Sequence, residues 1–119
     1  MVLDIIKNKK ITHDNAAFIT STILGSVAEN VIKKIILFGS YANGKPNRNS
    51  DIDLCIIIAN KRNSRAVYLK IALALFNRKI IPVDLLVYRE KDFNIGIRKN
   101  ERGIESVISS EGKVLYAQE

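Results

Sequence analysis

Three aspartates at two places in the sequence have the spacing of a metal site. Asp51 and Asp53 open an apolar, β-branched run that ends at Ile58. Side chains at positions i and i+2 of a strand project from one face, so these carboxylates repel each other unless cations neutralise them. Asp84 interrupts another apolar run, where a carboxylate needs a partner. If the two strands are neighbours, the three carboxylates converge and offer the hard oxygen ligands of a site for two magnesium ions.

A Gly-Ser pair upstream of these acids could hold phosphates. A strand that ends at Gly39-Ser40 and turns into a short helical segment presents backbone amides and a hydroxyl to an anion. Gly44 can take the positive φ needed to leave that segment. The stretch from Gly39 to Lys45 also contains most of a P-loop, but Pro46 supplies neither the hydroxyl nor the helix start that a P-loop needs. We therefore reject the P-loop and retain the carboxylate interpretation.

The elements that must position these residues follow from the apolar pattern. In chain order it predicts a short helix over 2–9, a helix over 12–31, strands over 34–38 and 51–58, a helix over 65–77, a strand over 81–88, and a helix from 104 that ends before Gly112. After Tyr88 the chain becomes polar, and 113–116 form a short strand or an extended tail. The strand-helix-strand over 51–88 is long enough for a parallel crossover.

Two predicted helices depend on particular apolar stripes. The helix over 12–31, with Thr12 or Asp14 as its cap, is indicated by these positions: Ile19, Ile23, Val27 and Val31. The helix over 65–77 is indicated by these positions: Ala66, Leu69, Leu73 and Phe76. The predicted fold class is α/β (α+β), with a small mixed β-sheet flanked by helices.

Composition limits the setting in which this chemistry takes place. The 119 residues suffice for a single domain over 1–119, and 19 Lys and Arg against 12 Asp and Glu give a net charge of +7. This balance favours anionic partners, but the basic residues are spread along the chain, so nucleic acid is not expected as the main ligand. The lone Cys55 lies in an apolar run as a buried thiol, and no apolar run or leader pattern indicates a membrane span or a signal peptide. A cytoplasmic protein is therefore expected.

The motifs in combination resemble a known family. Gly39-Ser40, ten intervening residues and then Asp51-x-Asp53 resemble the signature of the DNA polymerase beta-like nucleotidyltransferase superfamily. The frame Leu-Phe-Gly-Ser-Tyr-Ala-Asn-Gly, five residues, then Ser-Asp-Ile-Asp-Leu is most similar to its minimal nucleotidyltransferases of the MntA type. The resemblance is close over 35–88 and covers 12–34 and 104–116 in general layout.

The resemblance implies roles for each matched residue. Asp51 and Asp53 would bind magnesium, and Asp84 would occupy the third carboxylate position and act as general base. Gly39 and Ser40 would hold the phosphates of ATP, from which AMP passes to a hydroxyl.

One position departs from the family pattern, and size bears on the acceptor. The family often has arginine where this chain has Asn43, so either transfer is slower or Lys45 or Arg48 supplies that charge. Larger members carry additional domains that bind the acceptor, whereas this chain would meet its acceptor on another protein. The resemblance implies a HEPN-domain toxin, adenylylated on a tyrosine by an antitoxin of this type.

Two other hypotheses stay open at this point. The chain could be a non-catalytic nucleotide-binding module that neutralises a partner by complex formation alone, or a nucleotidyltransferase that modifies RNA. The RNA-modifying hypothesis draws on the net charge, but it would require a domain to hold RNA, which is not expected in this sequence. Among single residues, His13 is interpreted as a surface or capping residue, and Tyr41 as either packed or shielding the nucleotide. Arg98, Lys99 and Arg102 are interpreted as a solvated helix face.

Overall fold

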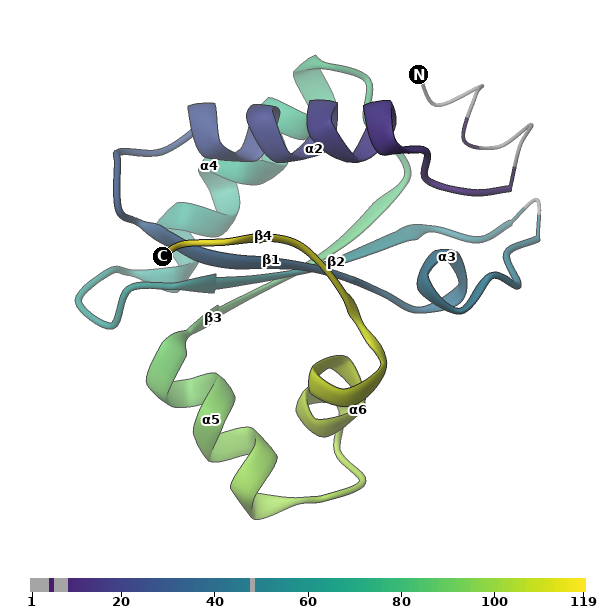
Figure 1. Cartoon of the computed structure of the whole chain (residues 1–119). Helices are drawn as coiled ribbons and strands as arrows, with labels where there is room; N and C mark the ends of the chain where they lie inside the picture. Colours follow the sequence, from purple (N-terminus) through teal and green to yellow (C-terminus); the bar gives the residue numbers. More distant parts are fainter. Residues whose placement is uncertain (1–4, 6–8, 48) are drawn as a thin grey trace.

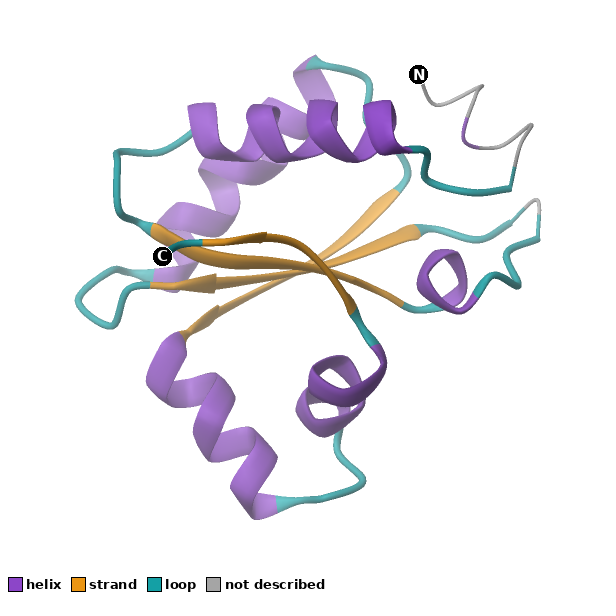
Figure 2. Ribbon diagram, in the orientation of Figure 1, coloured by secondary structure: helices purple, strands orange, loops and turns teal. Residues whose placement is uncertain are grey.

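A four-stranded mixed sheet forms the centre of the molecule, with helices on both faces (Figures 1 and 2). This computed structural model describes residues 5, 9–47 and 49–119, so the short helix expected over 2–9 lies largely outside the described residues. The elements are α2 (His13–Gly25), β1 (Ile32–Phe38), α3 (Ser40–Asn43), β2 (Ile52–Ile58), α4 (Ser64–Asn77), β3 (Val83–Arg89), α5 (Glu90–Lys99), α6 (Ile104–Glu111) and β4 (Lys113–Ala117). The α/β class and the mixed sheet are confirmed.

The strands lie in the order β3-β2-β1-β4. β1 runs antiparallel to both β2 and β4, whereas β2 and β3 are parallel and are joined through α4. The parallel crossover predicted over 51–88 is therefore confirmed. Residues 113–117 form a true strand rather than a loose tail, because β1 offers them a partner for backbone hydrogen bonds.

The sheet separates two apolar cores. α2 and α4 cover one face, and α5 and α6 cover the other (Figure 1). Alternate residues of β2 contribute to the two cores, because successive side chains of a strand point to opposite faces. Those on the side of α2 and α4 include Ile52, Leu54 and Ile56, and those on the side of α5 and α6 are Cys55 and Ile57. Burial on both faces beyond Asp53 is thus confirmed, and so is the buried, free thiol of Cys55.

The first long helix is shorter than predicted. α2 ends at Gly25 rather than near Val31, because Ser26 closes it: its backbone amide and its hydroxyl both donate to the carbonyl of Ile23, at 3.1 and 2.6 Å. Its start is the capping box formed by Thr12 and Asn15, in which each backbone amide donates to the other side chain. His13 is the exposed first residue of the helix, as expected.

The prediction for α4 named the wrong face. The helix is present, but its buried residues are Val67, Ile71 and Leu75. Leu69, Leu73 and Phe76 of the predicted stripe are 57%, 61% and 65% exposed. Both stripes have helical spacing, so the sequence could not decide which one packs on the sheet.

The sequence predicted no bounds for α5, only a polar stretch after Tyr88 with Arg98, Lys99 and Arg102 on a solvated helix face. Arg98 and Lys99 are exposed on α5, whereas Arg102 lies in the turn after it. The helix occupies 90–99, and only Phe93 within it is buried. The available signal was electrostatic, because Glu90 and Asp92 lie in the first turn and Arg98 and Lys99 in the last, where each complements the helix dipole. α6 ends at Glu111, directly before Gly112, as predicted.

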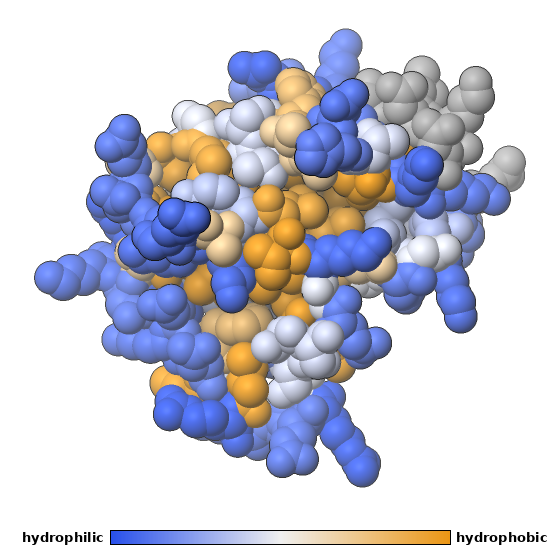
Figure 3. Space-filling model, viewed as in Figure 1, coloured by the Kyte–Doolittle hydropathy of each residue, from blue (hydrophilic) through white to orange (hydrophobic). Residues whose placement is uncertain are grey.

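In the view of Figure 3, hydrophilic side chains surround apolar side chains that are gathered over β4. Val114 of this edge strand is 55% exposed. In the part of the chain that the structure describes, no helix has the length and apolar character needed to cross a membrane.

Candidate active site

The site is built where β1 ends and β2 and β3 begin. β1 stops at Phe38, Gly39 follows with φ 74° and ψ −155°, and α3 starts at Ser40. The carbonyl of Gly39 accepts hydrogen bonds from the backbone amides of Ala42 and Asn43, at 3.0 and 3.1 Å, and these bonds start the helical turn. The first amides of a helix have no acceptor within it, so this turn presents donors next to the sheet. Gly44 ends the turn with φ 80°, as predicted.

The sheet register places two of the acids side by side. Phe38 pairs with Asp53 across the antiparallel β1–β2 ladder, and Asp53 pairs with Asp84 across the parallel β2–β3 ladder. Paired residues of neighbouring strands project from the same face, here the face that carries α5 and α6. Asp51 lies two residues before Asp53, and Asp51 and Asp84 are both exposed. The condition set for the three carboxylates, that their two strands are neighbours, is therefore met.

Asp53 has the perturbed electrostatics of this cluster. Its pKa is raised from the ordinary 3.8 to about 6, first by burial and then by the negative charges of Asp84 and Asp51. The two neighbouring acids are thus close enough to oppose ionisation of Asp53. A cation placed among them would relieve that repulsion.

Gly39 brings the backbone directly against Asp53. A Cβ at position 39 would collide with Oδ2 of Asp53 and lie 3.0 Å from its Cγ. Only glycine combines this close approach with the positive φ. The Gly-Ser turn and the acids are therefore one continuous site, although they are separated in sequence.

The donor set suits a hard cation, but the side chains do not converge on one. Carboxylate oxygens at a single sheet edge are the ligands that magnesium prefers. Within residues 5, 9–47 and 49–119, no three His, Cys, Asp or Glu side chains are grouped closely enough to hold a metal ion. Metal binding by Asp51, Asp53 and Asp84 therefore stays a prediction.

The turn after α3 gives Asn43 a structural contact. Its Oδ1 accepts the backbone amide of Lys45 at 3.0 Å, which fixes the exit from the helical turn. The side chain of Lys45 is exposed, and Arg48 lies outside the described residues. Tyr41 is 6% exposed and belongs to the core, which favours packing over shielding of a nucleotide. No described residue between Lys45 and β2 is helical, in agreement with rejection of the P-loop.

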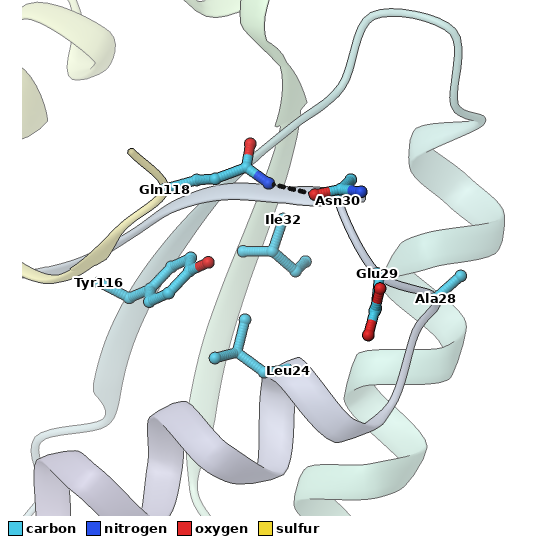
Figure 4. Close-up of a pocket in the computed structure, with 7 residues that line it drawn as sticks. All are labelled: Leu24, Ala28, Glu29, Asn30, Ile32, Tyr116 and Gln118. Carbon is cyan, nitrogen blue, oxygen red and sulfur yellow. Dashed lines mark hydrogen bonds between the residues drawn. The ribbon is translucent and has the colours of Figure 1, made fainter.

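A pocket of about 250 Å³ lies away from this site (Figure 4). Leu24, Ile32 and Tyr116 line it, and Gln118 Nε2 donates to Asn30 Oδ1 at 2.7 Å at its rim. Ile32 begins β1, whereas the acids lie at the far end of that strand, roughly 20 Å away at the usual rise per residue. This pocket therefore takes no part in the chemistry of the acids.

The family model for polymerase beta nucleotidyltransferases matches residues 21–119 of the chain. The chain belongs to this family. The match contains the Gly-Ser turn and all three acids, so the resemblance drawn from the motif is confirmed. None of the curated protein sequences compared with the chain matches it.

Solved structures share the fold. A toxin–antitoxin complex with AMP-PNP matches with a TM-score of 0.63 and 24% identity, over 88% of this chain and 75% of the other. A mutant of the toxin–antitoxin MntA–HpeT matches with the same TM-score and coverage and 22% identity. The third is a tri-AMPylated Shewanella oneidensis HEPN toxin in complex with MNT antitoxin, with a TM-score of 0.51 and 20% identity, over 87% of this chain and 73% of the other. At these identities the likeness establishes the fold.

Proposed function

We propose that this chain transfers AMP from ATP to a hydroxyl group, and that the acceptor is a tyrosine of a HEPN-domain partner protein. The observation that carries the proposal is the register that sets Asp53 beside Asp84, with Gly39 packed against Asp53. It is supported by the family match over 21–119 and by the AMPylated HEPN toxin of one structural relative.

Each residue of the site has a distinct task in this reaction. Gly39 and Ser40 bind the triphosphate through backbone amides and a hydroxyl. Asp84 takes the proton of the acceptor hydroxyl while the hydroxyl oxygen attacks the α-phosphorus of ATP. A new phosphorus–oxygen bond forms to the acceptor, the bond to the β-phosphate breaks, and pyrophosphate leaves.

Asp51, Asp53 and Asp84 are the residues that would hold magnesium. Bound there, magnesium would neutralise developing charge on the phosphates and lower the pKa of the acceptor hydroxyl. The pKa of Asp53 is raised to about 6 first by burial and then by the charges of Asp84 and Asp51, and such a cation would relieve the second of these causes.

Mass spectrometry of a HEPN-domain protein from the same genome tests the proposal. With the chain, ATP and magnesium, we expect the partner to gain the mass of adenylyl groups on tyrosine. With EDTA, or with Asp51→Asn combined with Asp53→Asn, we expect the partner mass to stay unchanged. Asp14→Asn is the matched control, because this exposed aspartate lies at the start of α2, which packs on the sheet face opposite to that of Asp53 and Asp84. A partner modified equally by the double variant would contradict the proposal.

Calorimetry separates catalysis from binding alone. A non-catalytic module would bind ATP and the partner protein and leave the partner mass unchanged. An active enzyme would bind ATP more tightly with magnesium than with EDTA and would release pyrophosphate in step with adenylylation. Unmodified partner in a complex that contains ATP and magnesium would therefore favour the binding module.

A further inference from the structure

The outward face of α4 is apolar and is left largely open by the residues that the structure describes. We define the α4 face as the surface formed by the exposed side chains of Tyr68, Leu69, Leu73 and Phe76 together with that of Ile81, which follows the helix. Their exposed fractions are 40%, 57%, 61%, 65% and 43%. Side chains three and four positions apart are neighbours on a helix, so this set forms one continuous surface. Contiguous apolar surface of this kind marks an interaction site.

The chain segment that carries the α4 face contains charges of only one sign. Between Asp53 and Asp84 the sequence contains no acidic residue, and its basic residues are Lys61, Arg62, Arg65, Lys70, Arg78 and Lys79. All of these basic side chains are exposed. Arg65 and Lys70 lie one helical turn from Leu69 and Leu73, respectively, so positive charge borders the apolar surface directly.

Two grooves flank the helix and give the α4 face a shape. One, of about 180 Å³, runs between α4 and β3 and is lined in part by Tyr68, Phe76 and Ile81. The other, of about 450 Å³, runs between α4 and the segment after α2 and is lined in part by Lys70 and Leu73. Concave apolar sites of this size accept the anchoring side chains of a folded partner.

We propose that the α4 face is the docking surface for a protein partner that presents an apolar segment bordered by acidic side chains. Charge complementarity identifies this occupant, since acidic rims would meet basic ones around an apolar centre. A second copy of the chain would bring Arg65 and Lys70 of two α4 helices together, and like charges would oppose that contact. A phosphate backbone would leave Leu69 and Leu73 without apolar partners, and a flat lipid surface would leave the grooves unfilled.

The α4 face adjoins the acids around the edge of the sheet. The groove beside β3 is lined by Val83 and Leu85, the residues on either side of Asp84. Successive residues of a strand face opposite ways, so Asp84 projects from the other face of β3. β3 is an edge strand, and a partner seated on the α4 face therefore has a short path around that edge to the acids. This docking mode rests on the proposed function, because it places the acceptor protein beside the site.

The test measures how a HEPN-domain protein from the same genome binds to the full chain. The variant combines Leu73→Glu with Phe76→Glu, both at exposed positions. The matched control is Ile104→Glu, which makes the same kind of change at a 49% exposed position of α6, on the opposite face of the sheet. Far-UV circular dichroism and thermal melting establish that each variant is folded. The ATP affinity of the chain without its partner shows whether the candidate active site is intact.

The α4 variant should raise the Kd for the HEPN protein at least about tenfold, the loss typical of a central interface position. Its ATP affinity should equal that of the wild type, and Ile104→Glu should bind normally. Lys70→Glu should also weaken binding and reduce its dependence on salt.

Unchanged affinity of the α4 variant, or wild-type chain that does not bind the HEPN protein, would overturn the proposal. So would α4-dependent binding only to anionic vesicles, to poly(U) RNA or to a second copy of the chain. Weaker binding with no AMP transfer by the wild type would refute the proposed function and leave the docking surface standing. Full AMP transfer by the α4 variant, with an unchanged Kd for the HEPN protein, would refute the docking surface and leave the proposed function standing.

Discussion

Replacing Asp53 by asparagine should stabilise the metal-free protein at neutral pH. The pKa of Asp53 is raised from the ordinary 3.8 to about 6 by burial, then by Asp84 and Asp51. The folded state therefore holds a proton on Asp53 that the unfolded state has already lost, and stability falls as the pH rises from about 4 through about 6. Asparagine has the same shape and no charge, so the variant avoids this loss.

The size of the effect follows from the change in pKa. A rise from 3.8 to about 6 corresponds to at most about 3 kcal/mol at neutral pH. Asp53 is partly exposed, and solvent screening reduces the expected gain to about 1 kcal/mol. Below the ordinary pKa of aspartate, both states are protonated and the variant should gain nothing.

Urea unfolding in EDTA, followed by circular dichroism at several pH values between about 4 and 8, measures this difference. The gain should grow across that range and level off above about pH 6, the folded pKa of Asp53. Glu101→Gln, at an exposed position between α5 and α6, is the control for loss of a carboxylate elsewhere. A variant that is less stable than the wild type at neutral pH, or a gain that does not depend on pH, would refute the reasoning.

Three further predictions concern the turn, the core and the thiol. Gly39→Ala should lower the free energy of unfolding by about 2 kcal/mol or more and impair ATP binding. Gly44 also has a positive φ, but nothing lies within 4 Å of a new Cβ, so Gly44→Ala should cost only about 1 kcal/mol; urea unfolding measures both values. Ile71→Ala should cost about 2–5 kcal/mol because Ile71 is fully buried, whereas Leu69→Ala on the same helix should change stability by no more than about 0.5 kcal/mol. Cys55 is buried, and burial and Glu105 raise the pKa of its thiol to about 12. The thiol should therefore resist iodoacetamide in the folded protein at mildly alkaline pH and react once urea unfolds the chain. Labelling at equal rates in both states would contradict this prediction.

Elements with local signals could be predicted from the sequence without knowledge of the fold. Gly39, Gly44 and Pro46 restrict the backbone directly, so the turn and the absence of a P-loop helix follow from these residues alone. The apolar run after Asp53 predicted a strand buried on both faces, because such a run has no polar side to leave in water. The motif that joins Gly39-Ser40 to Asp51 and Asp53 was sufficient to indicate the family.

Features that depend on which surfaces meet required the folded structure. Two stripes of α4 have helical spacing, and only packing against the sheet selected Ile71 over Leu69 for the core. α5 has too few apolar residues to predict from periodicity and is held through Phe93 against the sheet. The register that pairs Asp53 with Asp84 joins strands about thirty residues apart in sequence, a long-range contact that no local pattern encodes. The raised pKa of Asp53, caused first by burial and then by Asp84 and Asp51, likewise exists only in the folded structure.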